Sequence, residues 1–206
     1  MSWKEAVWGK VEDFRRQHVP GDLAHLPLDV ISIAELELRL DLVPFDDLYT
    51  KFNADAAIMA DFTGIYVDAE TYQLIDAAPE WKLNRLRFSI AHEVGHWAMH
   101  RAEFAERSFS DFSEFARWTG ENGGRKYDIE REANEFAGRL LVPIEQLRGL
   151  FEEFAESADH FLSSDWRLDP EIRRSAAKRL SQKFGVHGDA MLVRFDREDL
   201  WREPFQ

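Results

Sequence analysis

The chain contains no cysteine, which excludes a disulfide framework, thiol catalysis and any metal site with sulfur ligands. It also lacks an apolar run close to the ~18 residues that a membrane-spanning helix needs. Residues 1–5 (MSWKE) have no apolar core of the kind found in signal peptides. We therefore expect a cytoplasmic protein with no membrane partner, in which histidine and carboxylate side chains must hold any metal ion.

Positive charge is in short supply, since 39 Asp and Glu residues outnumber 26 Lys and Arg residues and leave a net charge of −13. This balance disfavours binding of nucleic acid by the whole molecule. One predicted helix near the C-terminus carries a basic face, formed by Arg173, Arg174, Lys178, Arg179 and Lys183. We interpret it as a solvated face or a docking surface for an acidic partner, with contact to DNA as the weaker alternative.

Apolar periodicity and turn signals divide the 206 residues into three parts. Residues 1–28 form an N-terminal extension with an amphipathic helix over 3–18. Residues 29–145 form the core, and residues 146–206 form a helical subdomain with a helix–turn–helix-like tract around Gly185. Between the core helices, the segment 103–127 is irregular and rich in phenylalanine and acidic residues.

Within the core, we expect Asp29 to cap a helix that ends near Leu40. Short extended segments follow, and a turn over Asp61–Gly64 would pair the last two as a hairpin. The predicted strands and longer helices cover residues 42–45, 56–62, 65–67, 84–100 and 128–142.

The pentapeptide His92-Glu93-Val94-Gly95-His96 is an HExxH motif. On a helix, residues i and i+4 lie on one face, so two imidazoles placed in this way can bind one metal ion. Glu93 is rotated by about 100° from His92, so it is free to act as a base toward a water molecule. The two histidines share their stripe with Phe88, Gly95 and Met99. Since burying polar rings without a partner is costly, metal binding is favoured over two hydrogen-bonded core histidines.

A catalytic zinc site needs a third protein ligand. Ala102 stands where metzincins have a histidine, so a glutamate on the later helix is the alternative. Glu130 falls inside the apolar arc of that helix, whereas Glu132 lies about 200° away on a predicted solvent face that also carries Glu135 and Arg139.

We take Glu130 as the third ligand. The competing explanation is a carboxylate stabilised by the dipole at a helix N-terminus. Asn134, one turn beyond Glu130, is placed to hydrogen-bond a ligand histidine and fix its tautomer.

Two motifs together, RFSIAHEVGHWAMH and EREANEFAGRLLVP, resemble the ImmA/IrrE family of zinc metallopeptidases. The likeness extends over roughly residues 26–196 and includes LPLDVISIAE, GIYVD and KRLSQKFGVHGDAMLVRF. His187 and Phe195 depart from the residues usual at their positions. The resemblance implies an α+β fold with a gluzincin-like, zincin-type core. A small antiparallel or mixed sheet would pack on the HExxH helix, and a helical helix–turn–helix-like subdomain would follow.

The resemblance also implies a zinc-dependent endopeptidase with one zinc ion per chain, held by His92, His96 and Glu130, and with Glu93 as general base. Its protein substrate would be a helix–turn–helix repressor whose cleavage derepresses stress or mobile-element genes. Sites of this His₂Glu type also accept manganese or iron. The alternative is a non-proteolytic, metal-containing regulatory protein of the toxin–antitoxin type, although a structural metal site has no use for Glu93.

Two further residues have open interpretations. His100 follows the motif on nearly the same helix face and is either a second-shell partner of a ligand or a core group. Tyr127 precedes the second motif and is either an oxyanion-stabilising group or an ordinary packed tyrosine.

Overall fold

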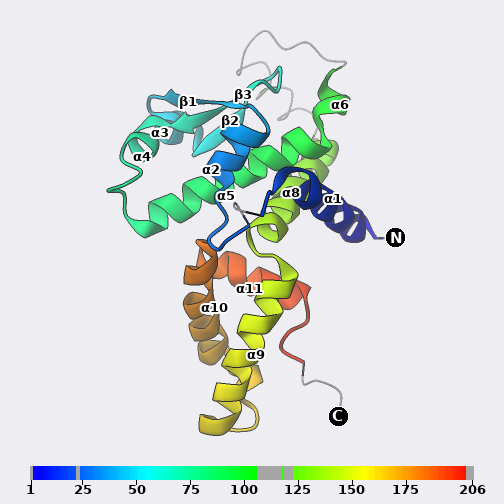
Figure 1. Ribbon diagram of the computed structural model, residues 1–206, viewed down its shortest axis with the longest axis vertical. Coiled ribbons are helices and arrows are strands. Elements are labelled where there is room, and N and C mark those ends of the chain that lie inside the picture. Colours follow the sequence, from blue (N-terminus) through cyan, green and yellow to red (C-terminus); the bar gives the residue numbers. More distant parts are fainter. Residues whose placement is uncertain (1, 22–23, 106–116, 118–122, 203–206) are drawn as a thin grey trace.

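The structure is a computed structural model that describes residues 2–21, 24–105, 117 and 123–202. It confirms the predicted α+β class and shows a small mixed sheet packed against long helices (Figure 1). Most of the irregular segment predicted at 103–127 lies outside the described residues. The division of the chain at residues 28 and 145 stays a prediction.

The first helix, α1 (Trp3–His18), begins at a capping box. The Ser2 hydroxyl accepts the Glu5 N–H at 3.3 Å, and the Glu5 carboxylate accepts the Ser2 N–H at 2.6 Å. Val7, Val11 and Phe14 are buried on its inner face, which packs on α8 (Gly123–Leu141). The predicted helix over 3–18 is confirmed.

The predicted helix over 29–40 is shorter than expected. Asp29 does cap it, since its side chain accepts the Ser32 N–H at 3.0 Å. However, α2 (Val30–Ser32) passes into a π-helical turn, η1 (Ile33–Glu37). Arg39 then adopts a left-handed φ of 57° and leads the chain into β1 (Asp41–Phe45).

The sheet has the order β1-β3-β2, with β2 (Ala56–Ile58) and β3 (Gly64–Asp68) antiparallel and β1 parallel to β3. The predicted hairpin is therefore confirmed, but its first strand stops at Ile58 and not at residue 62. The reason is the turn itself. Asp61 accepts the N–H and hydroxyl of Thr63 at 3.1 and 2.8 Å, and Phe62 has a φ of 59°, so these residues cannot continue a strand.

Two short helices, α3 (Leu48–Phe52) and α4 (Ala69–Gln73), flank the sheet and were not expected from the sequence. The HExxH motif lies on α5 (Glu80–Met99), which starts four residues earlier than predicted and is followed by α6 (Arg101–Ala105). Helix α5 runs beneath the sheet and crosses α8, with which it makes the most extensive contact in the described part of the chain (Figure 1).

The face of α8 that we predicted to be solvent-exposed is covered, so that prediction is wrong. Glu135 and Arg139 are buried. The Trp8 indole of α1 donates to Glu135 at 2.7 Å, and Arg139 pairs with Glu198 at 2.6 Å. Periodicity places residues on one face of a helix, but it does not show that α1 and the C-terminal helix will pack over that face.

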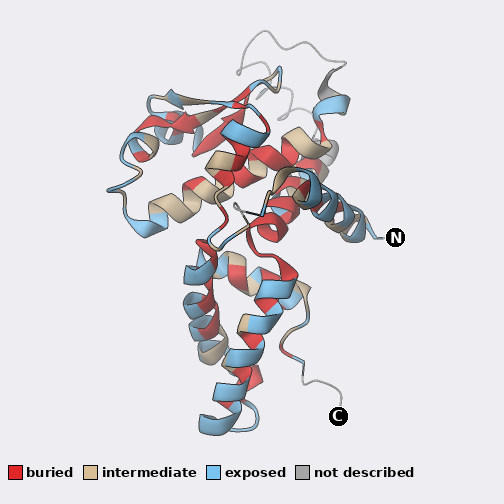
Figure 2. Cartoon of the chain, viewed as in Figure 1, coloured by how far each residue is buried: buried red, intermediate tan, exposed pale blue. Residues whose placement is uncertain are grey.

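The remaining chain forms α9 (Ile144–Phe161), a 3₁₀ turn η2 (Trp166–Leu168), α10 (Pro170–Phe184) and α11 (Gly188–Arg197). Gly185 ends α10 with a φ of +60°, a conformation that favours glycine. On the predicted basic face, Lys178, Arg179 and Lys183 are exposed, as expected, whereas Arg173 donates to the Arg167 carbonyl at 2.6 Å. Buried residues face inward along α5, α8 and α10 (Figure 2).

Among the described helices, none combines the length and the apolar character needed to cross a bilayer.

Gly95 allows α5 and α8 to approach closely. A Cβ atom at this position would lie 3.2 Å from Phe136 and 3.3 Å from the Ala133 Cα, a main-chain atom that cannot rotate away. Replacing Gly95 with leucine should therefore push the helices apart and cost about 1–3 kcal/mol of stability. Thermal unfolding checks this, with Gly149→Leu as the control, since Gly149 has open space around it. Equal melting temperatures for the two variants would contradict the packing argument.

Candidate metal centre

Three potential ligands from two helices meet at one point. The Nε2 atoms of His92 and His96 on α5 lie 2.9 Å apart. Glu130 on α8 places one carboxylate oxygen 3.2 Å from His92 Nε2 and the other 3.8 Å from His96 Nε2. The three donor atoms all lie within 4.8 Å of one another. The structure thus brings together the three residues that the sequence selected as ligands.

The arrangement fits a zinc ion. Two imidazole nitrogens and one carboxylate are the ligand set of a catalytic zinc, whose Zn–N and Zn–O distances of about 2.0–2.2 Å hold tetrahedral donors roughly 3.3 Å apart. The observed separations bracket that value, so only small rotations of the side chains are needed. His96 is buried and Glu130 is partly exposed, which leaves one side of the site open.

Each histidine has a partner on its second nitrogen. His92 Nδ1 lies 3.0 Å from Asn134 Oδ1, the contact expected for Asn134. Because an amide oxygen only accepts, Nδ1 carries a proton, which leaves Nε2, the atom beside Glu130, as the nitrogen that can bind a metal.

His96 is held through a longer chain. Its Nδ1 lies 3.0 Å from His100 Nδ1, and His100 Nε2 lies 3.0 Å from the Glu132 carboxylate. His100 is almost completely buried. Through these two contacts it links His96 on α5 to Glu132 on α8. The prediction that Glu132 faces solvent is wrong, because the α5–α8 contact turns its side chain toward His100. The pairing of His100 and Glu132 was missed, although the i, i+4 spacing of His96 and His100 was a usable signal.

The Glu93 carboxylate reaches the sheet. It is buried, and its Oε2 accepts the main-chain N–H of Ile58 on β2 at 2.8 Å. Burial raises the pKa of Glu93 to about 7, even though His92 and the Ile58 hydrogen bond favour the ionised form. Sequence reasoning could not find Ile58, because any residue type can donate a main-chain hydrogen bond.

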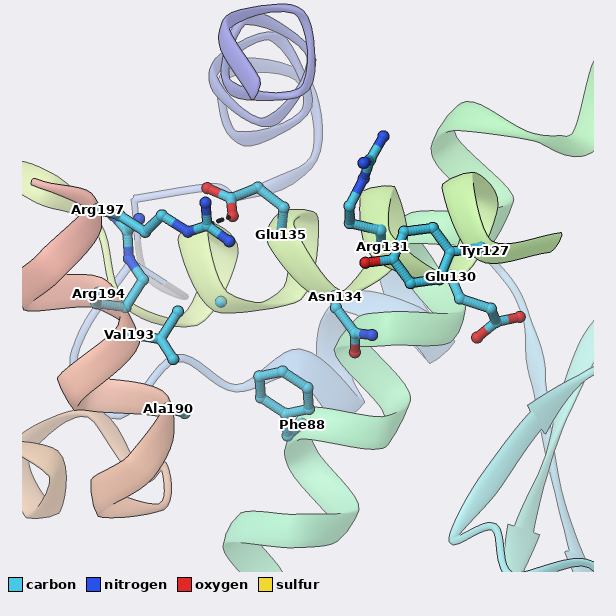
Figure 3. Close-up of a pocket in the computed structure, with 11 residues that line it drawn as sticks. Phe88, Tyr127, Glu130, Arg131, Asn134, Glu135, Ala190, Val193, Arg194 and Arg197 are labelled. Carbon is cyan, nitrogen blue, oxygen red and sulfur yellow. Dashed lines mark ion pairs between the residues drawn. The ribbon is translucent and has the colours of Figure 1, made fainter. Parts of the chain in front are cut away.

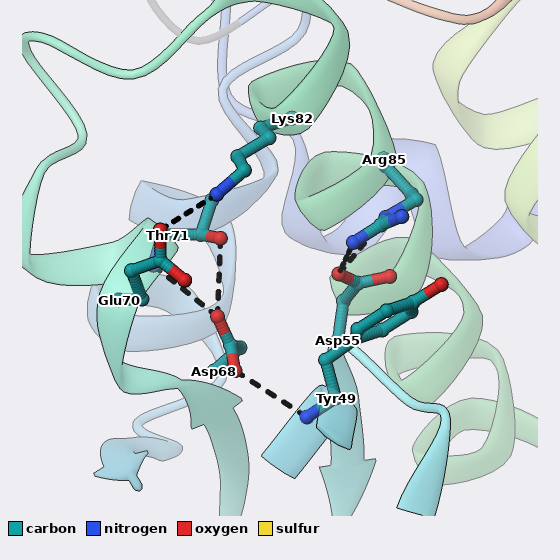
Figure 4. A network of polar contacts seen from close by, with 7 residues as sticks. All are labelled: Tyr49, Asp55, Asp68, Glu70, Thr71, Lys82 and Arg85. Atoms are coloured by element: carbon teal, nitrogen blue, oxygen red, sulfur yellow. Dashed lines mark hydrogen bonds and ion pairs between the residues drawn. The ribbon is translucent and has the colours of Figure 1, made fainter. Parts of the chain in front are cut away.

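A network of polar contacts fixes β2 against α5 (Figure 4). Arg85, two turns before His92, donates through Nε and Nη2 to Asp55 at 3.0 and 2.7 Å. Asp55 immediately precedes β2, and its carbonyl accepts the Asp68 N–H at 2.9 Å. Asp68 in turn accepts hydrogen bonds from Tyr49 and Thr71. The network therefore positions the strand that contacts Glu93.

A hollow adjoins the metal centre and is lined by both Glu130 and Asn134 (Figure 3). Tyr127 lies at its rim with two thirds of its surface exposed. A ring with this exposure does not match an ordinary packed tyrosine, and its assignment to an oxyanion stays a prediction.

Comparison with known proteins adds one finding. The family model Peptidase_M78, described as the IrrE N-terminal-like domain, matches residues 80–195, which is more than half of the chain. The match starts with α5 and ends within α11, so it includes every candidate ligand. A comparison with curated proteins found no match.

Metal affinity should fall as the pH is lowered. Burial disfavours the protonated form of His92, but the contacts with Glu130, Glu93 and Asn134 have the larger effect and raise the pKa of His92 above its ordinary value. A proton therefore competes with the metal ion for His92 in mildly acidic solution. Below the pKa of His92, each pH unit should weaken zinc binding about tenfold per displaced proton. Competition with a chromophoric chelator between pH 8 and pH 5.5 measures this. An affinity that does not change over that interval would contradict the assignment of His92 as a ligand.

Proposed function

This chain belongs to the Peptidase_M78 family of metallopeptidases, and we propose from that premise that it is a zinc-dependent endopeptidase with Glu93 as general base. The observation that carries the proposal is the meeting of His92, His96 and Glu130 beside a buried carboxylate that is not itself part of the ligand set. A zinc ion in this site would supply Lewis acidity, which lowers the pKa of a bound water to about 7 and polarises a carbonyl.

Glu93 is suited to move the proton. A base is most effective when its pKa lies near the working pH, and burial raises the pKa of Glu93 in the metal-free protein to about 7. Its carboxylate would take the proton of the attacking water and deliver it to the amine that leaves when the peptide bond breaks. The Ile58 N–H holds the carboxylate in a fixed orientation during both transfers.

The same strand offers a place for the substrate backbone. Ile58 donates toward Glu93, so the main-chain groups of Ala56 and Ile58 face away from β3 and toward the metal centre. An extended peptide would pair with this edge through main-chain groups other than the Ile58 N–H, which already donates to Glu93. From the resemblance of the two motifs to their family, we propose that this peptide belongs to a helix–turn–helix repressor.

A regulatory protein that only binds its partner is the second candidate. It would need the metal for structure alone, and a buried glutamate with a raised pKa would then have no role. Since burying a carboxylate is costly, its retention favours the enzyme.

Two substitutions separate the base from the ligand. Glu93→Gln should leave zinc content unchanged while cleavage falls by about two to four orders of magnitude, because an amide cannot take a proton. Glu130→Gln removes an anionic ligand, so zinc affinity and the zinc-dependent rise in melting temperature should fall together with cleavage. Zinc content, melting temperature and proteolysis are measured side by side. Glu153→Gln, exposed on α9, is the control.

The two outcomes test different statements. Full biological activity of Glu93→Gln would mean that the protein acts by binding. Undiminished zinc affinity of Glu130→Gln would mean that another group is the third ligand.

The role of Glu132 can be tested separately. If Glu132 fixes the His100 tautomer, and through it that of His96, Glu132→Leu should weaken zinc binding about 10–100-fold. Glu132→Gln should lose less, because its amide oxygen can still accept from His100. Nitrogen-15 NMR of the metal-free protein reports the tautomers directly, with His96 protonated on Nδ1 in the wild type. An unchanged tautomer and affinity in Glu132→Leu would show that the contact only stabilises the fold.

A further inference from the structure

The hollow beside the metal centre has a volume of about 360 Å³ and lies between α8 and α11, with Phe88 of α5 at its base (Figure 3). It is continuous with the candidate site, because Glu130 and Asn134 belong to both. Its size is within the range of pockets that bind ligands.

The position of the hollow follows from helix geometry. Phe88 lies one turn before His92 on α5, while Asn134 and Gly138 lie one and two turns after Glu130 on α8. At a rise of 1.5 Å per residue, these residues are about 6–12 Å from the ligands along the helices. An extended peptide advances about 3.3 Å per residue. If an extended substrate runs from the candidate ligands along α5 and α8, the side chain that enters the hollow lies two or three residues from the bond that is cleaved.

The chemistry of the walls favours an apolar side chain. Phe88, Gly138, Ala190 and Val193 form the middle of the hollow, and Val193 is half exposed. The arginines at the end farther from Glu130 are already engaged in ion pairs. Arg197 pairs with Glu135 at 3.4 Å, and Arg194 pairs with Glu198 at 2.9 Å. A charged substrate residue would have to lose its hydration without gaining an uncommitted counter-ion from these pairs.

The apolar surface continues beyond Phe88. A second hollow, of about 500 Å³, shares Phe88 and Ala190 with the first and runs between α5 and α11 as far as Trp81. More than half of the Trp81 surface is exposed. The two hollows together form a groove along the seam of α5 and α11, with the metal centre near one end.

We propose that this groove is a substrate-binding subsite, in which the hollow at Val193 takes a large apolar side chain, such as leucine or phenylalanine, two or three residues from the scissile bond. The inference rests on the proposed peptidase function, because a peptide bound in the groove is a substrate only if the protein cleaves it. Binding of an apolar side chain in the hollow does not itself depend on catalysis. Val193 and Ala190 on α11 are then specificity-determining residues, while α5 and α8 carry the chemistry.

Binding is tested first, without any reaction. N-acetyl-leucinamide is titrated into the zinc-loaded protein, and the methyl signals of Val193 and Ala190 are followed by NMR. We expect these signals to shift with the leucine probe and to stay in place with N-acetyl-aspartic acid amide. Unchanged methyl signals at saturating leucine probe, or equal shifts with both probes, would overturn the proposal.

Specificity is tested next, by mapping cleavage sites in a peptide library. The wild type should favour large apolar residues at one position two or three residues from the scissile bond. Val193→Asp places a charge in the hollow at an exposed position, so this preference should drop at least tenfold and lysine or arginine should become accepted. Leu168→Asp, on the 3₁₀ turn η2 and likewise an exposed apolar residue, is the control and should leave the preference unchanged.

The NMR titration and the cleavage-site mapping distinguish failure of the subsite proposal from failure of the peptidase proposal. Retention of the apolar preference by Val193→Asp would refute the subsite. A wild-type protein that binds zinc and the leucine probe but cleaves no peptide and no repressor would refute the peptidase function, and the NMR result would still support an apolar site.

Discussion

The closeness of α5 and α8 at Gly95 is the constraint on which the site depends. Two candidate ligands come from one helix and the third from the other, so the separation of the helix axes sets whether three donor atoms can share one ion. Phe136 and Ala133 fill the space where a side chain at Gly95 would stand. The small residue within the HExxH motif is therefore as necessary for the geometry as the histidines on either side of it.

Once the helices are this close, the polar groups between them lose water and must find partners in the protein. His92 meets Asn134, His96 meets His100, and His100 meets Glu132. Glu93 is satisfied from the opposite side, by the main chain of β2. Except for the contact of His96 with His100, which lies at the end of α5, these bonds cross from one element to another, so the contacts that satisfy these groups also fix the orientation of the candidate ligands.

What the sequence could predict was local. The i, i+4 spacing of the histidines and the place of Glu130 in an apolar arc depend only on the period of a helix, and the structure brings these residues together. What it could not predict depends on segments far apart in the chain. Glu135 is shielded from water by Trp8, which lies more than a hundred residues earlier in the chain. The partner of Glu93 is a main-chain group, and its position depends on how Asp55 and Arg85 hold β2.

This division between local and distant determinants has a consequence for specificity. The candidate ligands and Glu93 lie on α5 and α8, whereas one wall of the groove comes from α11, which the chain reaches only after α9 and α10. The buried pair of Glu198 with Arg139 anchors the end of α11 to α8 without touching the three candidate ligands. Exposed residues of α11 can therefore vary in size and charge while the ligand geometry stays constant. Under the proposed function, a fold arranged in this way can change the peptide it recognises independently of the chemistry of cleavage.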